Sequence, residues 1–380
     1  MRAFLFGAGL LALTASTAVA QSSFFGVRGL GFPGYGYSAR ARATGGAFGM
    51  IDPESSLNPG ALVGVPVITA TFNATPEWRW TTTPAGTGNL RDTRFPLATI
   101  GGPIPRTPFN FRISYSSYAD KDFALASGDS LILRGESMQV ADTIKSTGGM
   151  ADIGLTGAWR GPGGWNIGAA FHFITGSSRL SLKRQFSDTA YLPVAQQTQL
   201  SASGIGGAIG LVRRLAGPIT IALMARADGH ASIDVDSAHA FNVDLPYTLG
   251  GGLAWRVSPK LLIAGQGIYQ TWSSANSGLV QAGGVGSADT YQASLGWEYA
   301  SHPRGPGGYF LRFGGHYGTL PFYFIQGYQP REAGIAGGYG TRLGRGRAGL
   351  DFSLEYAYRW DNAGNTEKAL LFTTQFSVRP

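Results

Sequence analysis

Apolar residues alternate with polar or small residues along most of this chain, which is the pattern of β-strands with one apolar face. Residues 350–360 show it most clearly: the even-numbered positions from Leu350 to Trp360 are apolar or aromatic, and Asp351, Glu355 and Arg359 lie between them. The same alternation recurs at 109–116, 152–160, 165–173, 291–299 and 309–317. This repetition predicts an all-β sheet of many strands.

Connections of two lengths separate these strands. Short Gly/Pro segments lie at 160–164, 215–218, 257–260, 303–308 and 343–347, and longer connectors lie at 120–147, 187–196, 230–243, 273–287 and 319–332. Outer-membrane barrels alternate short periplasmic turns with longer external loops in this way. We therefore predict about fourteen strands, with both chain ends on the periplasmic side: 66–82, 93–102, 108–119, 149–160, 164–176, 197–213, 219–229, 244–257, 260–272, 287–300, 308–318, 333–343, 347–360 and 367–379.

The alternation alone fits a soluble sheet or a membrane barrel, so aromatic placement and composition decide between them. Tryptophans lie at or near the ends of the alternating runs, as interfacial girdles require: Trp159, Trp165, Trp255, Trp297 and Trp360. Only 14% of residues are charged, whereas 58 of the 380 are Gly, against a usual charged share of about 25%. These features predict a transmembrane antiparallel β-barrel.

The N-terminus has the layout of a secretory signal peptide. Arg2 precedes an apolar run, and Ala18-Val19-Ala20 provide the small residues of a cleavage site, so we assign 1–20 to the signal, 21–65 to a segment before the barrel and 66–380 to the barrel. Export and a barrel together indicate the bacterial outer membrane, with its lipid as partner. The net charge of +8 is scattered and forms no basic block, so we expect no nucleic-acid partner.

Residues 40–62 are broken by Gly and Pro and are rich in small side chains. This stretch resembles the N-terminal hatch of the FadL-type outer-membrane transporters of long-chain fatty acids and hydrocarbons. That resemblance implies a segment that folds into a fourteen-stranded barrel and plugs it. We expect Asp52 and Asn58 to turn the chain by bonding to backbone amides. The matching positions are Gly45, Gly46, Ala47, Asp52, Ser55, Asn58, Pro59 and Leu62.

Charged residues share the polar phase of the strands. Because a charge on the lipid side is costly near the membrane midplane, this phase is expected to face the lumen and to form a paired network around the hatch. A charge-selective aqueous pore is the alternative, and it requires an unplugged channel. The predicted lining is Arg112, Asp152, Arg160, Arg226, Glu298, Arg312, Asp351, Glu355 and Arg359.

Motifs for metal, cofactor or catalytic chemistry do not stand out. The histidines lack metal-site spacing, and Gly204–Gly210 lacks the βαβ context of a dinucleotide loop. We therefore expect no catalytic, metal or cofactor site and no enzyme. An outer-membrane hydrolase is a lesser alternative, and it would depend on His172, His230 or His316.

The leading interpretation is passive transport of a small hydrophobic ligand past the hatch. An apolar run in a predicted exposed loop is a possible capture site, because exposed apolar patches usually mark binding; it contains Phe322, Tyr323, Phe324 and Ile325. A non-transporting scaffold of the PorV type is the main alternative. The last strand, with apolar Leu370, Phe372, Phe376 and Val378 in alternation, resembles the signal that barrel-assembly machinery recognises.

Overall fold

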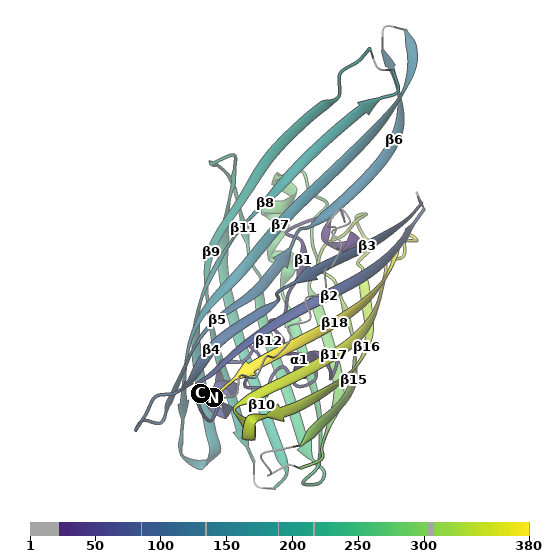
Figure 1. Ribbon diagram of the computed structural model, residues 1–380. Coiled ribbons are helices and arrows are strands. Elements are labelled where there is room, and N and C mark those ends of the chain that lie inside the picture. The colour runs from purple at the N-terminus through teal and green to yellow at the C-terminus, as the bar shows by residue number, and fades with distance from the viewer. Residues whose placement is uncertain are drawn as a thin grey trace, which may run out of the picture.

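The computed structural model describes residues 23–84, 86–133, 135–188, 190–215, 217–302 and 308–379. These residues form a tall barrel of tilted strands (Figure 1). The strands are β1 (Phe32–Pro33), β2 (Thr69–Thr83), β3 (Gly86–Arg94), β4 (Leu97–Pro103), β5 (Phe109–Asp120), β6 (Phe123–Leu133), β7 (Glu136–Arg160), β8 (Trp165–Phe186), β9 (Val194–Arg214), β10 (Ile219–Val235), β11 (Ala238–Asp244), β12 (Tyr247–Arg256), β13 (Leu261–Gln270), β14 (Thr290–Ala300), β15 (Tyr309–Thr319), β16 (Arg331–Leu343), β17 (Ala348–Trp360) and β18 (Thr366–Val378). The helices are α1 (Ala39–Arg42) and α2 (Asn276–Gln281), with short 3-10 turns η1 (Phe24–Gly26), η2 (Pro59–Gly64), η3 (Pro162–Gly164), η4 (Trp272–Ala275) and η5 (Gly344–Gly346).

The described residues form a closed antiparallel barrel of fourteen wall strands, as the sequence predicts. Three wall strands are interrupted, so that β3 and β4 share the partner β2, β5 and β6 share β7, and β11 and β12 share β10. Two of the breaks contain Pro96 and Pro246, whose missing N–H groups cannot take part in a ladder. The last strand β18 pairs with β2 and closes the barrel.

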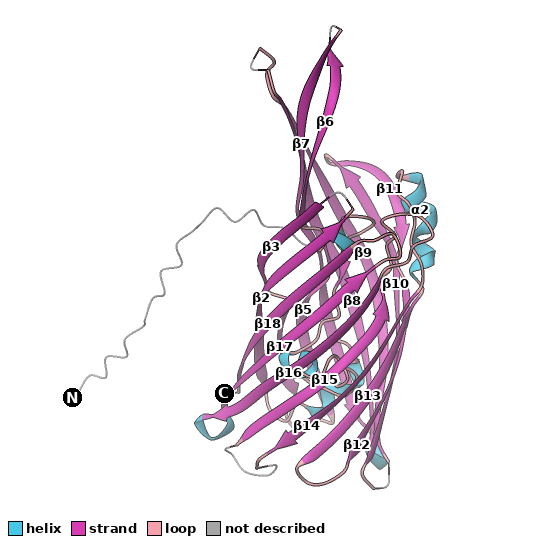
Figure 2. Cartoon of the chain, turned by 90° about the vertical axis from the view of Figure 1, so that its right-hand side faces the viewer, coloured by secondary structure: helices cyan, strands magenta, loops and turns pink. Residues whose placement is uncertain are grey.

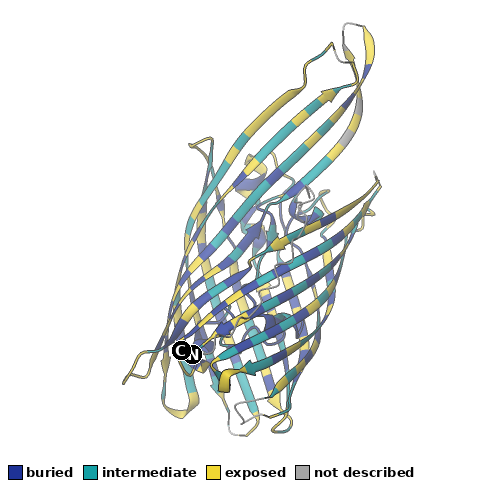
Figure 3. Cartoon of the chain, viewed as in Figure 1, coloured by how far each residue is buried: buried dark blue, intermediate teal, exposed yellow. Residues whose placement is uncertain are grey.

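The alternation places apolar side chains outside and polar ones inside. On β5, for example, Phe111 and Ile113 are exposed while Arg112 and Ser114 are buried. Figure 3 shows this alternation of exposed and buried bands along the wall strands. The pattern is the inverse of a soluble sheet and is the arrangement of a barrel in lipid. No described helix is long and apolar enough to cross a membrane.

Two of the long connectors predicted from the sequence are wrong. Residues 123–133 and 136–147 belong to β6 and β7, and 230–243 to β10 and β11. The β6–β7 hairpin projects beyond the barrel body (Figure 2). In this projection the apolar residues Met138, Val140 and Ile144 face inward, whereas Ile153 and Leu155 lower on β7 face outward. The apolar side chains therefore switch from the outer to the inner face along β7. A pattern that assumes one apolar face does not detect this upper part of the strand.

Residues 23–65, here called the luminal segment, lie inside the barrel. The segment begins at the end with the long projections, which we call the loop end, where Ser23 donates a hydrogen bond to Glu367 on β18 (2.8 Å). It descends to the opposite turn end, where η2 contacts β7, β8 and β9. The expectation that both chain ends lie on one side is therefore wrong for the described N-terminal residues. The assigned signal peptide, 1–20, falls outside the described residues.

Candidate ligand pathway through the barrel lumen

The predicted hatch residues all lie within the luminal segment and are buried. Gly45 and Gly46 have positive φ angles of 62° and 93°, and a Cβ on Gly45 would lie 2.7 Å from the backbone of Gly315 in the wall. Pro59 begins η2, and Leu62 packs against Ala158 on β7. Small residues thus let the segment touch the wall directly.

Asp52 does not turn the chain through backbone amides, contrary to the expectation. Its carboxylate accepts hydrogen bonds from the side chains of Ser38 (2.5 Å) and Ser55 (2.9 Å) and pairs with Arg40 (3.2 Å). Ser38 is the N-cap of α1 and accepts from the amide of Ala41. Asp52 therefore joins α1 to the rest of the segment through side chains.

Asn58 does turn the chain as expected. Its Oδ1 accepts from the amide of Gly60 (2.9 Å), and its Nδ2 donates to the carbonyl of Met50 (2.9 Å). The wall gives room for this turn, because a Cβ on Gly210 would lie only 1.9 Å from Asn58 Oδ1. Gly210 belongs to the Gly-rich run 204–210, which lies on the wall strand β9, and its missing side chain makes room for the luminal segment.

Several wall cations hold the segment through its carbonyl oxygens. Arg112 donates to Ser55 (2.6 Å) and to Pro53 (3.2 Å), and Arg160, itself exposed, donates to Val63 (3.0 Å). Arg42 of the segment pairs in turn with Glu355 on β17 (3.8 Å). These contacts orient the polar backbone of the segment toward a polar wall.

The other predicted lining residues form chains of ion pairs. Arg40 reaches Glu298 (2.6 Å), which also binds Arg312 (2.7 Å), and Arg312 pairs with Asp351 (2.5 Å). Breaking one such buried pair would leave its partner uncompensated. On the other side of the lumen, Asp152 binds Arg226 (2.7 Å) and His172 (2.8 Å). On the same side as Arg312, Arg359 on β17 binds Glu332 and Glu367.

An apolar cluster fills the lumen at the loop end. Phe322 lies in its centre, 1% exposed, with its ring 5.2 Å from that of Trp272. The expectation that this residue is exposed is therefore wrong. Phe324 packs on Phe24 of the luminal segment (4.4 Å), Tyr323 is half-buried and Ile325 is exposed. Other members of the cluster are Leu30, Tyr118, Met150, Ile174, Ile233, Val243, Leu245 and Leu279.

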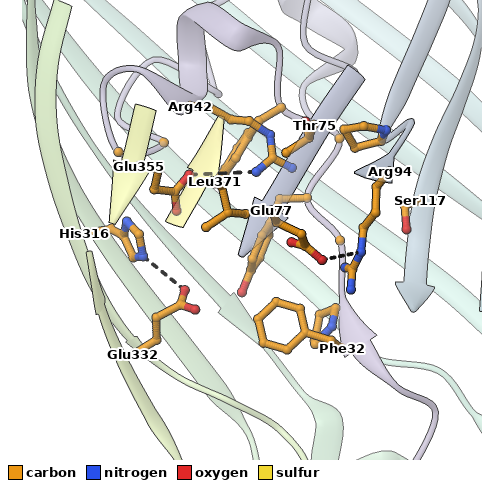
Figure 4. A pocket seen from close by; sticks show the side chains of 18 of the residues that line it. Phe32, Arg42, Thr75, Glu77, Arg94, Ser117, His316, Glu332, Glu355 and Leu371 are labelled. Atoms are coloured by element: carbon orange, nitrogen blue, oxygen red, sulfur yellow. Dashed lines mark hydrogen bonds and ion pairs between the residues drawn. The ribbon is translucent and has the colours of Figure 1, made fainter. Parts of the chain in front are cut away.

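Two small cavities lie beside the luminal segment and share residues 34–36 as a lining. The first, of about 80 Å³, lies toward β2 and β15–β17 and is lined by Glu77, His316 and Glu332 among others (Figure 4). The second, of about 50 Å³, lies toward β5, β7 and β10. A cavity needs roughly 10–15 Å³ to hold a water, so both accept water or a small ligand. Residues 34–36 are the partition between them.

The wall pairing breaks beside this partition. In the described residues β3 is paired with β2 and β6 with β7, and no pairing joins β3 to β6. The luminal strand β1 covers the free edge of β5 here, with Phe32 opposite Asp120 and Pro33 opposite Ala119. An ion pair between Arg94 and Asp120 (2.9 Å) spans the break.

Lys121 lies at the interruption between β5 and β6 and ties the luminal segment to it by donating to the carbonyl of Gly29. Burial, with a smaller contribution from Arg28, lowers the pKa of Lys121 to about 8. No local pattern indicates this tether. The same is true of Arg40, Arg42 and Glu54, which are charges within a segment of small residues and face complementary wall charges.

The histidines do not converge on one site. His172 pairs with Asp152 and His316 with Glu332, on different sides of the lumen, while His230 and His239 are exposed on β10 and β11. Among the described residues no group of three or more His, Cys, Asp and Glu side chains could hold a metal ion. His302 is exposed near a turn.

Several solved structures have a fold similar to that of this chain. A FadL homologue from Pseudomonas aeruginosa matches 93% of this chain and 99% of its own, at 12% identity and a TM-score of 0.61. The toluene transporter TbuX of Ralstonia pickettii (TM-score 0.58) and the monoaromatic hydrocarbon channel CymD (0.55) each match 91% of this chain and 98% of their own, at 15% identity. No protein-family model and no curated protein matches the sequence.

The described chain is thus a closed antiparallel barrel with an apolar outer surface and with residues 23–65 inside the lumen. Its fold is that of the FadL-type transporters, as the resemblance of residues 40–62 implies.

Proposed function

We propose that this protein sits in the bacterial outer membrane and passes small hydrophobic molecules, such as hydrocarbons or long-chain fatty acids, by passive uptake. The observation that carries the proposal is the apolar cluster inside the barrel at the loop end, around Trp272 and Phe322. Apolar side chains that fill the lumen would block an aqueous pore. An apolar ligand, by contrast, can replace the contacts between these side chains at little cost in free energy. The neighbouring structures named as toluene and hydrocarbon transporters support the same ligand class.

The luminal segment divides into two parts in this account. The lower part, residues 37–65, is the seal, because wall strands around the barrel hold it by ion pairs and hydrogen bonds. The upper part, residues 23–36, is the gate, because it carries the partition between the cavities and covers the break in the wall. A ligand leaves the apolar cluster when the gate moves and passes sideways through the break beside β1.

Sideways exit suits an apolar ligand, because hydrocarbon lies immediately outside this part of the wall. Phe95 and Tyr115 flank the break and are 54% and 45% exposed on the outer face. A route straight down the lumen would instead cross the charged network, where an apolar molecule gains nothing and separates paired charges.

Uptake by intact cells tests the function. A Gram-negative strain without its own hydrocarbon or fatty-acid transporter would carry this chain or an empty vector and receive radiolabelled toluene or a long-chain fatty acid. Faster initial accumulation of either ligand supports the proposal, and the faster of the two identifies the ligand class. Accumulation equal to the vector for both contradicts it, and stable co-purification with exported proteins would then favour the PorV-like scaffold.

The last strand is also expected to serve assembly. β18 pairs with β17 along its whole length and with β2 at the closure, so it is the strand that must be placed before the barrel can close. We infer that the barrel-assembly machinery recognises it. Replacing Phe376, which is 46% exposed, with Ser should reduce the amount of assembled barrel in outer-membrane fractions.

A further inference from the structure

The short turns at the turn end contain or adjoin cations and contain no acidic residue. Six such turns lie at 104–108, 161–164, 215–218, 257–260, 301–308 and 344–347, and neither the turns nor the residues on either side of them include Asp or Glu. Six cations in these turns or directly beside them are exposed in the structure: Arg106, Arg214, Arg256, Lys260, Arg345 and Arg347. In the described part of the chain none of these six forms an ion pair. The charge at this end is therefore uncompensated.

The loop end has a different composition. Its hairpin connections contain Asp188, Asp236, Asp289 and Asp361, whereas the short turns at the turn end contain no carboxylate. The net charge of +8 is thus not spread evenly along the barrel axis. An uncompensated cationic surface favours an anionic partner.

The distribution of the cations decides what kind of anion fits. They belong to the turns β4–β5, β9–β10, β12–β13 and β16–β17, which lie around the barrel rather than on one side. A compact acidic protein would contact only part of such a ring. The headgroups of the surrounding lipid leaflet form a ring of the same shape and contact every turn.

The depth of the cations agrees with a lipid partner. Trp255 and Trp159 are 49% and 37% exposed on the outer face and directly precede Arg256 and Arg160. Trp165 lies at the same end, with the guanidinium of Arg213 4.2 Å from its ring centre. Interfacial tryptophans lie at the level of the headgroups, so the adjacent cations reach the phosphate layer.

We propose that the turn end is a ring-shaped binding surface for the phosphate groups of anionic phospholipids, formed by Arg106, Arg214, Arg256, Lys260, Arg345 and Arg347. The proposal rests on the placement of the barrel in a membrane and does not depend on transport. Its functional effect is to hold the turn end in the periplasmic leaflet and to collect anionic lipid around the barrel.

Tryptophan quenching by brominated lipids in vesicles tests the proposal. In mixtures of phosphatidylcholine and phosphatidylglycerol, bromine is placed on one lipid or the other. The unmodified chain should be quenched more by brominated phosphatidylglycerol than random mixing predicts, and raised salt should remove the excess. Changing the six cations to Gln should reduce the excess by about twofold or more.

The matched control changes six loop-end cations to Gln: Arg91, Lys145, Arg179, Lys183, Arg331 and Lys368. This control should keep the excess quenching, and heat-modified gel mobility verifies that both variants fold. No preference for phosphatidylglycerol in the unmodified chain overturns the proposal, as does a preference that survives in the turn-end variant. If soluble poly-glutamate displaces the brominated lipid at low concentration, the partner is an acidic polymer and the lipid proposal is wrong.

Discussion

The two parts of the luminal segment are held in different ways, although they are continuous in sequence. The seal, residues 37–65, contacts the wall around the barrel: Gln266 on β13 accepts from the amide of Met50 (2.9 Å), Glu298 on β14 binds Arg40, and Arg112 on β5 holds Ser55. The gate, residues 23–36, pairs with β5 over two residues and is tied at its start to Glu367. In the proposed function, this difference allows the gate to move while the seal stays.

Removing part of the seal should have the largest effect. A chain lacking residues 40–62 keeps the barrel but loses α1, η2 and the carboxylate of Asp52. Because a barrel of this strand number encloses an open lumen, ion conductance across a planar bilayer should rise by more than about tenfold. Conductance and uptake that both stay unchanged would show that these residues do not plug the barrel.

Breaking one anchor of the seal should destabilise it strongly. Arg40→Met leaves Asp52 and Glu298 without their shared cation, and loss of a partner in a buried pair costs about 3 kcal/mol. Urea unfolding in detergent micelles should show this loss. Lys368→Met, at an exposed position on β18, is the control and should change stability by less than about 0.5 kcal/mol. Equal effects of the two changes would refute the anchoring role of Arg40.

Two glycine substitutions should separate the gate from the seal. A Cβ on Gly210 would lie 1.9 Å from Asn58 Oδ1 in the seal, and one on Gly34 would lie 2.1 Å from the carbonyl of Ser117 beside the gate. Each Ala substitution should cost about 2 kcal/mol through overpacking. Gly210→Ala should increase ion leakage, whereas Gly34→Ala should speed ligand uptake without leakage. If Gly34→Ala increased ion leakage and Gly210→Ala sped ligand uptake, the roles given to the gate and the seal would be wrong.

The smallest expected effect is a pH dependence of stability that comes from Lys121, which holds the gate. Burial lowers the folded-state pKa of Lys121 to about 8, below its ordinary 10.5, so the unfolded chain binds more protons between these values and stability rises with pH in that window. Partial solvent screening limits the change to about 1 kcal/mol. Thermal unfolding of the protein and of Lys121→Met, compared at pH 7 and 10, measures it. A falling rather than rising difference would contradict the burial of this amine.

The sequence allowed prediction of those parts of the fold that lipid dictates. Strands such as β5 and β17 alternate with the apolar side outward, because hydrocarbon surrounds them. Beyond the membrane water replaces lipid, and Met138 and Val140 on β7 turn inward instead, so β6 and the upper part of β7 were missed. Which face of a strand is apolar therefore depends on whether lipid or water surrounds it, and the apolar face switches sides where lipid gives way to water.

The candidate site was less accessible to prediction for a related reason. Small residues such as Gly45 and Ala47 identified the luminal segment, but contacts with sequence separations of hundreds of residues, as between Glu54 and Arg379 or Arg40 and Glu298, leave no local pattern. Phe322 looked exposed because a loop is usually at the surface, whereas here the loop folds back over the lumen. Register across a closed barrel, rather than local spacing, creates the site.

The most direct test of the account is a pair of reversible locks, which this cysteine-free chain permits. Pro33→Cys with Ala119→Cys joins β1 of the gate to its register partner on β5. Met50→Cys with Gly252→Cys joins the seal to β12, because a Cβ on Gly252 would lie 2.9 Å from that of Met50. Each variant carries one disulfide. When it is formed, ligand uptake by intact cells should stop in the gate-locked chain and recover on reduction, whereas uptake should continue in the seal-locked chain. Uptake by the gate-locked chain at the rate of its reduced form would contradict the account.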